Sequence, residues 1–300
     1  MSRRAPAASV YKRTLARVVR QALDEDIGRG DITTLAVVPA NARGTARLVA
    51  REAGVIAGLD VARAVFRALS KNVRFTAKVR DGQRVRRGAV IAEVRGPLRA
   101  ILTGERVALN FLQRLSGIAT LTRAYVARAS VARAKPAEVL DTRKTTPGLR
   151  AFEKAAVRAG GGTNHRFALD ELIMIKNNHI AAAGSITAAV RRVRKRFPRH
   201  RIEVEARTPA EVREAAALNP DIIMLDNMTP AQMRRAVAVI RSMSPKTAIE
   251  ASGSMTLARV RAVAHTGVDW ISVGALTHSA PALDIALACG KRAPCVVRTA

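Results

Sequence analysis

The 300-residue sequence is poor in aromatic residues and in cysteine. Aromatic side chains make up 3% of it, so the stacking platforms that bind single-stranded nucleic acids are scarce. The two cysteines, Cys289 and Cys295, are too few for a disulfide framework and have no metal-ligand partners at useful spacing. We therefore expect both to be structural thiols.

Long apolar runs are also missing. No stretch reaches the roughly 20 apolar residues that a membrane span needs, and the arginine-containing N-terminus has no continuous apolar segment like that of a secretory signal. These absences predict a cytoplasmic protein with no membrane partner. With 48% hydrophobic residues, the chain can nevertheless bury a sizeable core.

Acidic residues are scarce relative to basic ones. Lys and Arg number 52 against 23 Asp and Glu, which gives a formal net charge of +29 and raises nucleic acid as a partner. The densest basic run, 191–196, follows Ile186 and Val190 at helical spacing, so a solvated helix face explains it more simply. Because no zinc-finger, RRM or basic-zipper pattern occurs, we expect no specific nucleic-acid partner. A positive field that concentrates polyanionic small substrates is the functional alternative.

The first third of the chain predicts an α+β domain. Apolar residues at helical spacing predict a helix over 8–27, which a glycine-rich turn ends. A second helix is expected over 60–69, and a long helical pattern from about 98 to 128 leads into the next domain. Short apolar runs between glycines predict strands at 46–50, 55–57, 73–79 and 90–94.

Beyond this helix, short β-prone runs alternate with helical stretches, as a parallel sheet requires. Polar or small residues follow every run. In a (β/α) barrel the carboxyl ends of the strands converge on one mouth, whereas an open sheet would spread the same residues along an edge. We favour the barrel. The runs and the residues after them are 138–140 with Asp141 to Lys144, 172–175 with Lys176 to His179, 202–204 with Glu205, 222–225 with Asp226 and Asn227, 248–249 with Glu250 to Gly253, and 270–273 with Gly274.

These strand ends carry three kinds of chemistry. Cations suit a substrate with several carboxylates, because guanidinium groups bind carboxylates bidentately. Carboxylates on adjacent strands, here Glu205 and Asp226, suit Mg²⁺. Serine and glycine turns that open helices suit a phosphate bound by backbone N–H groups. Each residue alone also has a structural explanation, as a surface charge, a helix-terminal charge or a turn. Taken alone, His165 is explained as a loop residue. For His179 we expect a structural role. The cations are Arg143, Lys144, Arg166 and Lys176.

Several longer motifs surround these residues. The central ones are 141–150, which reads DTRKTTPGLR, 153–157, and 160–162 with His165 and Arg166. Others are 172–179, 203–205, 225–227, 250–253 and 271–274, and upstream 28–34 and 105–110. Together they resemble the signature of quinolinate phosphoribosyltransferases over nearly the whole chain.

The resemblance implies a transferase of de novo NAD biosynthesis. Such an enzyme converts quinolinate and phosphoribosyl pyrophosphate to nicotinate mononucleotide, pyrophosphate and carbon dioxide. The implied fold is an N-terminal α+β open sandwich over 1–116, completed by 280–300, and an incomplete α/β barrel over 117–279. The implied assembly is a homodimer or larger homo-oligomer in which Arg106 reaches the neighbouring subunit's barrel mouth.

The resemblance also implies roles for individual residues. Quinolinate contacts are expected from Arg106, Thr142, Arg143, His165, Arg166 and Lys176. Phosphoribosyl pyrophosphate contacts are expected from Lys144, Glu205, Asp226, Ser252, Gly253, Gly274 and His278. Among these, Lys144, Glu205 and Asp226 are the expected catalytic residues, with Glu205 and Asp226 acting through Mg²⁺.

Two positions depart from the family pattern. Asn177 stands where the family usually has Asp, which removes a charge near Lys176, and Ser254 stands where it usually has Gly, which narrows the room beside the phosphate. Neither is an expected contact residue. A sister group linked to molybdenum transport is the alternative reading; it shares the Thr-Arg-Lys motif but departs from the stretch around Lys176, whose presence favours the quinolinate enzyme.

Overall fold

The computed structural model describes residues 8–130 and 136–288. These residues form two compact units, and the division falls between Arg123 and Ala124 within one long helix. The sandwich unit contains 8–123, 145–161 and 280–288, and the barrel unit contains 124–130, 136–144 and 162–279. Cys289 and Cys295 lie outside the described residues.

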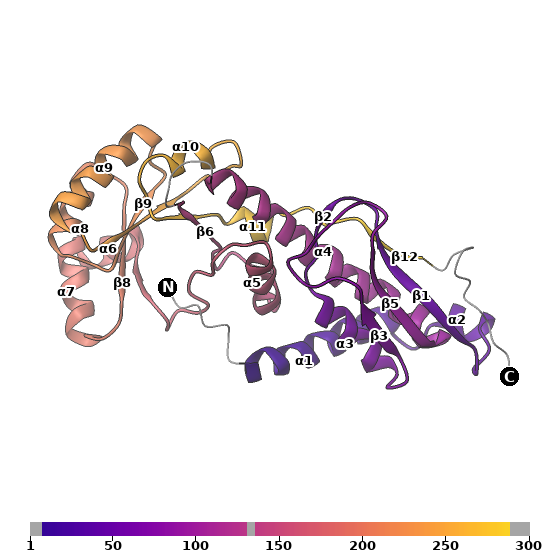
Figure 1. Ribbon diagram of the computed structural model, residues 1–300. Helices are drawn as coiled ribbons and strands as arrows, with labels where there is room; N and C mark the ends of the chain where they lie inside the picture. Colours follow the sequence, from indigo (N-terminus) through magenta and orange to yellow (C-terminus); the bar gives the residue numbers. More distant parts are fainter. Residues whose placement is uncertain (1–7, 131–135, 289–300) are drawn as a thin grey trace. The chain divides into compact units, whose positions relative to one another are not determined.

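The barrel unit is built on a six-stranded parallel sheet (Figure 1). Among the described residues, the strands pair in the order β6-β11-β10-β9-β8-β7, and β6 and β7 do not pair with each other, so the barrel is incomplete, as predicted. An isolated bridge between Leu140 and Thr163 lies beside β6. The strands are β6 (Glu138–Leu140), β7 (Ile173–Ile175), β8 (Ile202–Ala206), β9 (Ile222–Asp226), β10 (Ala248–Ser252) and β11 (Trp270–Ser272).

Helices follow these strands and cover the outside of the sheet, as α7, α8 and α9 do around β8 and β9 (Figure 1). Side-chain caps fix where three of them begin. Ser185, Thr208 and Thr229 each accept a hydrogen bond from the first turn of α7, α8 and α9, and a proline opens α8 and α9. The helices of this unit are α6 (Asn177–Ala183), α7 (Ile186–Arg196), α8 (Pro209–Ala217), α9 (Pro230–Met243), α10 (Val260–Ala264) and α11 (Ala275–His278).

The sandwich unit contains an antiparallel sheet in the order β12-β1-β5-β3. Its last strand comes from the C-terminal part of the chain, because β12 pairs with β1 from Arg47↔Ala288 to Ala50↔Ile285. The strands are β1 (Arg43–Ala50), β3 (Arg74–Ala77), β5 (Val90–Pro97) and β12 (Ile285–Ala288), with a separate pair β2 (Gly54–Val55) and β4 (Arg84–Val85). The helices are α1 (Ala8–Ile27), α2 (Ile32–Val37), α3 (Leu59–Leu69), α4 (Leu98–Ser130) and α5 (Arg150–Ala159).

The observed elements differ from the predicted ones mainly at their ends. The run expected over 55–57 forms a strand only at Gly54–Val55, and 73–79 shortens to Arg74–Ala77. Helix α2 was not predicted; the Asp31 side chain starts it by accepting a hydrogen bond from the Thr34 N–H at 2.9 Å. The predicted domain limits at 116/117 and 279/280 stay predictions.

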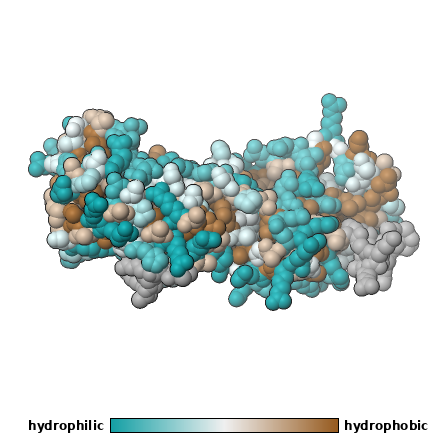
Figure 2. Space-filling model, turned by 90° about the horizontal axis from the view of Figure 1, so that it is seen from above, coloured by the Kyte–Doolittle hydropathy of each residue, from teal (hydrophilic) through white to brown (hydrophobic). Residues whose placement is uncertain are grey.

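Hydrophilic residues cover most of the face shown in Figure 2, and hydrophobic residues form scattered patches between them. Within the described part of the chain, every helix is either too short or too polar to pass through a bilayer.

Candidate active site

The carboxyl ends of the barrel strands surround one cavity of about 760 Å³. All the residues that line it belong to the barrel unit. Twelve of the thirteen residues predicted for the site line this cavity, and Arg106 lies in the other unit, on α4. The twelve are Thr142, Arg143, Lys144, His165, Arg166, Lys176, Glu205, Asp226, Ser252, Gly253, Gly274 and His278. Their places match the predicted geometry, while their individual contacts with substrates stay predictions.

The cations differ in how firmly the fold holds them. Arg166 is half-buried; its Nη1 donates to the Leu172 carbonyl at 2.7 Å, and its Nη2 lies 3.8 Å from the Met174 sulfur. Burial and the nearby Arg143 charge lower the pKa of Arg166. Because a guanidinium keeps its proton near neutral pH, this crowding of like charge favours an anionic ligand.

Lys176 is exposed and stands at the N-terminus of α6. Its backbone N–H donates to Nδ1 of His179 at 3.0 Å, so His179 caps the helix, the structural role expected for it. Asn177, which stands where the family usually has Asp, lies next to this cap. Its backbone N–H donates to Glu205 Oε1 at 3.3 Å, a contact that does not depend on the side chain at this position.

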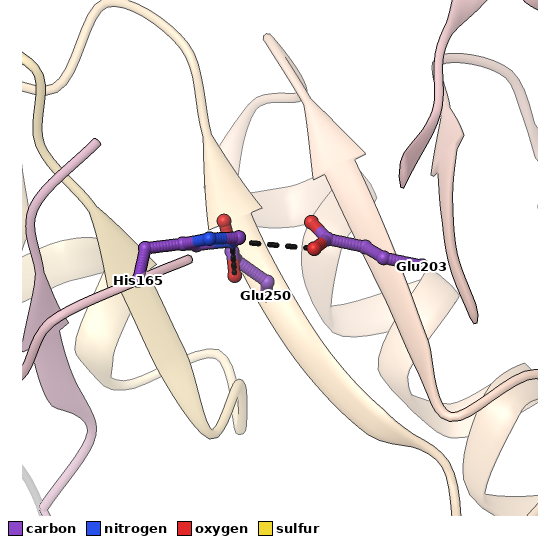
Figure 3. A group of neighbouring side chains, drawn as sticks. All are labelled: His165, Glu203 and Glu250. Carbon is purple, nitrogen blue, oxygen red and sulfur yellow. Dashed lines mark ion pairs between the residues drawn. The ribbon is translucent and has the colours of Figure 1, made fainter. Parts of the chain in front are cut away.

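His165 is buried, and one end of its ring faces two carboxylates from the strands (Figure 3). Its Nε2 is 3.2 Å from Glu203 Oε2 on β8 and 3.4 Å from Glu250 Oε2 on β10. On the other side of the ring, Nδ1 accepts the backbone N–H of Arg166 at 2.7 Å. The backbone N–H of His165 donates to Asp141 Oδ1 at 2.8 Å. The imidazole is therefore held at both ring nitrogens.

The raised pKa of His165 favours a doubly protonated ring, whereas its hydrogen-bond geometry favours a ring with one proton. Burial alone would lower the pKa of His165, but Glu203 and Glu250 outweigh burial and raise it to about 10. Burial and the Glu250 charge raise the pKa of Glu203 to about 7. However, the bond from the Arg166 N–H makes Nδ1 an acceptor, so the ring carries its proton on Nε2, and a second proton at Nδ1 would break that bond.

Glu205 and Asp226 place two carboxylates in the cavity wall, at the ends of the paired strands β8 and β9. Glu205 is buried, and Asp226 is half-buried with its Oδ2 accepting from the Asn227 amide at 2.9 Å. Mg²⁺ binds through one or two carboxylates and the phosphates of a substrate. Two carboxylates on one wall of a cavity that is open to a ligand fit that pattern.

Tight loops close the side of the cavity formed by β9, β10 and β11. Asn227, Gly253 and Ser254 have φ of 55°, 91° and 42°, all in the left-handed region. A Cβ at position 253 would collide with the Asn227 side chain, so this position requires glycine. A Cβ on Gly274 would lie 3.0 Å from Lys144 Cδ, so its absence leaves room for that lysine. Ser254 stands where the family usually has Gly. Because it adopts a left-handed backbone conformation, a serine here lowers the free energy of unfolding by about 1 kcal/mol relative to glycine.

Part of the cavity wall was not predicted from the sequence. Met174, Met224 and Ser272 also line it, and Glu203 lies behind His165. Glu250 lines it too; it was expected at a strand end but was given no role. A signal for the acids was present, because side chains two residues apart in a strand share a face. Glu203 precedes Glu205 by two positions, and Glu250 precedes Ser252 by two.

Models of known protein families match both parts of the chain. Residues 31–116 match the N-terminal domain of quinolinate phosphoribosyl transferase, and residues 118–288 match its C-terminal domain. The sequence is also similar to that of the Synechocystis sp. protein named "Probable nicotinate-nucleotide pyrophosphorylase (carboxylating)". The two are 49% identical over 270 residues, which cover 90% of each chain. The nicotinate-nucleotide pyrophosphorylase (carboxylating) of Mycobacterium leprae is 43% identical over 272 residues, 90% of this chain and 95% of that one.

Solved structures agree with these sequence matches. The nicotinate-nucleotide pyrophosphorylase of Francisella tularensis superposes with a TM-score of 0.86 at 41% identity, over 91% of this chain and 95% of that one. NadC from Streptococcus pyogenes gives the same TM-score at 42% identity over the same shares of the two chains.

Proposed function

This chain belongs to the quinolinate phosphoribosyltransferase family, and we propose that its barrel cavity is where quinolinate reacts with phosphoribosyl pyrophosphate. The products are nicotinate mononucleotide, pyrophosphate and carbon dioxide, a step of NAD biosynthesis. The observation that carries the proposal is the meeting of cations, carboxylates and glycine-rich loops in one cavity, from segments far apart in the sequence.

Quinolinate binds at the cationic side of the cavity. Its two carboxylates are recognised by Arg143, Arg166 and Lys176, with Thr142 and His165 beside them. The half-buried Arg166 guanidinium is oriented before substrate arrives, because the Leu172 carbonyl holds it. Preorganisation of this kind lowers the cost of bringing the pyridine nitrogen to the reacting carbon.

Phosphoribosyl pyrophosphate binds at the opposite side. The Ser252 to Ser254 turn and Gly274, which opens α11, present backbone N–H groups to its phosphates, and Lys144 and His278 flank them. Glu205 and Asp226 would hold Mg²⁺, which when bound neutralises charge on the pyrophosphate.

The pyridine nitrogen displaces pyrophosphate from ribose C1 through an oxocarbenium-like transition state. Positive charge that develops on the sugar faces the carboxylates of Glu205 and Asp226, and negative charge on the leaving group faces Lys144. No covalent intermediate with the protein is required. In the dicarboxylate nucleotide that forms first, the ring nitrogen is cationic, so the C2 carboxylate leaves as carbon dioxide. Its bonding electrons stay at C2, stabilised beside that charge, and C2 then takes up a proton from water to give the product.

The test is an assay with quinolinate carrying a labelled C2 carboxylate. We expect labelled carbon dioxide only when both quinolinate and phosphoribosyl pyrophosphate are present, and no product from nicotinate. Nucleotide formation from nicotinate, or no carbon dioxide from quinolinate, would contradict the proposal. We further propose that the enzyme acts in the cytoplasm as a homodimer or larger homo-oligomer whose Arg106 serves the neighbouring subunit's cavity.

A further inference from the structure

Glu203 and Glu250 have no part in the mechanism above, yet both are fully buried beside the cavity. Two carboxylates of like charge are costly to bury together unless partners compensate for the lost hydration. Their carboxylates approach the same atom, Nε2 of His165, from β8 and β10 (Figure 3). One oxygen of Glu250 also accepts the Ser272 hydroxyl at 2.5 Å.

The remaining carboxylate oxygens have few other choices. Among the described residues, Glu250 Oε2 and both oxygens of Glu203 make no hydrogen bond of ordinary geometry. The contacts of these oxygens with Nε2 of the imidazole, at 3.2 and 3.4 Å, are thus the interactions that compensate for their burial. Because both buried carboxylates depend on His165, they also fix the position of its ring.

The ring in turn is tied to the main chain of the quinolinate pocket. Its Nδ1 accepts the Arg166 N–H, while its Nε2 faces the two acids. The carboxylates thereby determine the tautomer of His165, and the tautomer determines whether Nδ1 can accept that N–H. The chain of contacts runs from the acids through the imidazole to the backbone of the arginine expected to bind substrate.

We infer that Glu203 and Glu250 are positioning residues for quinolinate, which hold His165 and, through it, the start of the Arg166 side chain. The inference rests on the proposed function. It predicts an effect that depends on the substrate, because the acids act on the cationic side of the cavity. Among the described residues, neither acid side chain forms a hydrogen bond or ion pair with the loops at 252–254 and 274.

The experiment compares Glu203→Gln, Glu250→Gln and the double variant with wild type in steady-state kinetics and calorimetry. Glutamine keeps the size of each side chain and removes its charge. We expect KM and Kd for quinolinate to rise about tenfold in each single variant and about a hundredfold in the double variant, with KM for phosphoribosyl pyrophosphate changing less than about twofold. Glu214→Gln is the matched control, since this carboxylate contacts Thr187 on the outer helices and should leave both constants unchanged.

Several outcomes would overturn the inference. Equal quinolinate constants in wild type and variants would remove the positioning role, and parallel increases for both substrates would indicate a general structural effect. The three side chains also lie close enough to hold a cation, so stoichiometric metal in the purified wild type that is lost in Glu203→Gln would make them metal ligands instead. An inactive wild type that still binds quinolinate would contradict the proposed function, and the calorimetric Kd values for quinolinate would then decide the inference by themselves.

One further variant keeps the test decisive if a glutamine variant fails to fold. Ser272→Ala removes the hydrogen bond to Glu250 without changing any charge. A smaller rise in the quinolinate KM, about threefold, with the phosphoribosyl pyrophosphate KM unchanged, is the expected result. No rise in the quinolinate KM would count against the inference.

Discussion

At the scale of single residues, Arg166 offers the sharpest test of the quinolinate pocket. Arg166→Ala removes a guanidinium that is half-buried and oriented by the Leu172 carbonyl. Leaving a bound carboxylate without its partner costs about 3 kcal/mol, or about a hundredfold in kcat/KM for quinolinate. Steady-state kinetics measure this, with Arg191→Ala on the exposed face of α7 as the control for charge. Wild-type turnover in Arg166→Ala would show that the pocket is misassigned.

A substitution at Glu205 tests the side of the cavity that we propose binds phosphoribosyl pyrophosphate. Glu205→Ala removes one of two carboxylates proposed to hold Mg²⁺, so we expect binding of phosphoribosyl pyrophosphate to lose its dependence on Mg²⁺ and to weaken at least about tenfold. Quinolinate binding should remain, because its expected contacts lie elsewhere. Calorimetry with each substrate, with and without Mg²⁺, separates the two effects. Loss of quinolinate binding instead would indicate general damage to the barrel.

The residues at strand ends could be predicted because each follows an apolar run directly, so local pattern alone located Lys176, Glu205 and Asp226. Glu250 also follows an apolar run, and Glu203 shares a strand face with Glu205, but the contact of these two acids with His165 could not be found in the same way. Their role depends on His165, a loop residue whose distance from both acids in the sequence hides the contact. Recognising them required the three-dimensional positions of a loop and two strands.

At the scale of elements, α5 is joined to α4 by an ion pair between buried Glu153 and half-buried Arg114. Glu153 is fully buried, and its Oε1 accepts from Arg114 Nε at 2.9 Å and Nη2 at 2.7 Å, while its Oε2 accepts the Thr146 N–H at 3.0 Å. Glu153→Gln leaves this arginine with a weakened, neutral partner. We expect the free energy of unfolding to fall by about 3 kcal/mol in denaturant titrations.

The matched control is Asp24→Asn, which breaks an exposed pair with Arg20 on α1. Exposed pairs contribute between about 0 and 1 kcal/mol, so its unfolding curve should nearly overlay that of wild type. If Glu153→Gln were as stable as Asp24→Asn, the buried pair would not anchor α5.

Strong periodicity made most elements predictable, and short elements were the exceptions. The helix expected over 8–27 matches α1, and all six barrel strands were found, although β8 and β10 extend two and three residues beyond their predicted ends. Helix α2 was missed because it has six residues and exposes Ile32 and Val37, so it carries no buried apolar stripe. Capping by Asp31 starts that helix, and caps are weak signals in sequence.

At the scale of the whole molecule, the position of Arg106 makes a prediction about assembly. If it serves the neighbouring subunit, a mixture of Arg106→Ala and Lys144→Ala subunits can form hybrid dimers with one complete site. Each variant alone should be nearly inactive, and the equilibrated mixture should recover about a quarter of wild-type activity. If Arg106 instead acted within its own subunit, no hybrid would contain a complete site and activity would stay at the level of the separate variants.

The large positive charge is the feature of the whole molecule that sequence patterns did not explain. A net charge of +29 creates a field that draws in a polyanion such as phosphoribosyl pyrophosphate, and salt screens such fields over about 10 Å at 0.1 M ionic strength. We therefore expect kcat/KM for phosphoribosyl pyrophosphate to fall at least about fivefold between about 0.02 and 0.3 M salt at constant free Mg²⁺, with little change in kcat.

A variant can separate the general field from the basic run on α7. Arg191, Arg192 and Lys195 are exposed there, and replacing all three with Ala lowers the charge from +29 to about +26. If the field of the whole molecule captures the substrate, this variant should retain most of the salt dependence, because most of the charge remains. A salt dependence abolished by the triple variant would mean that this run alone guides the substrate. A wild-type kcat/KM that does not change with salt would mean that the charge has no part in substrate capture.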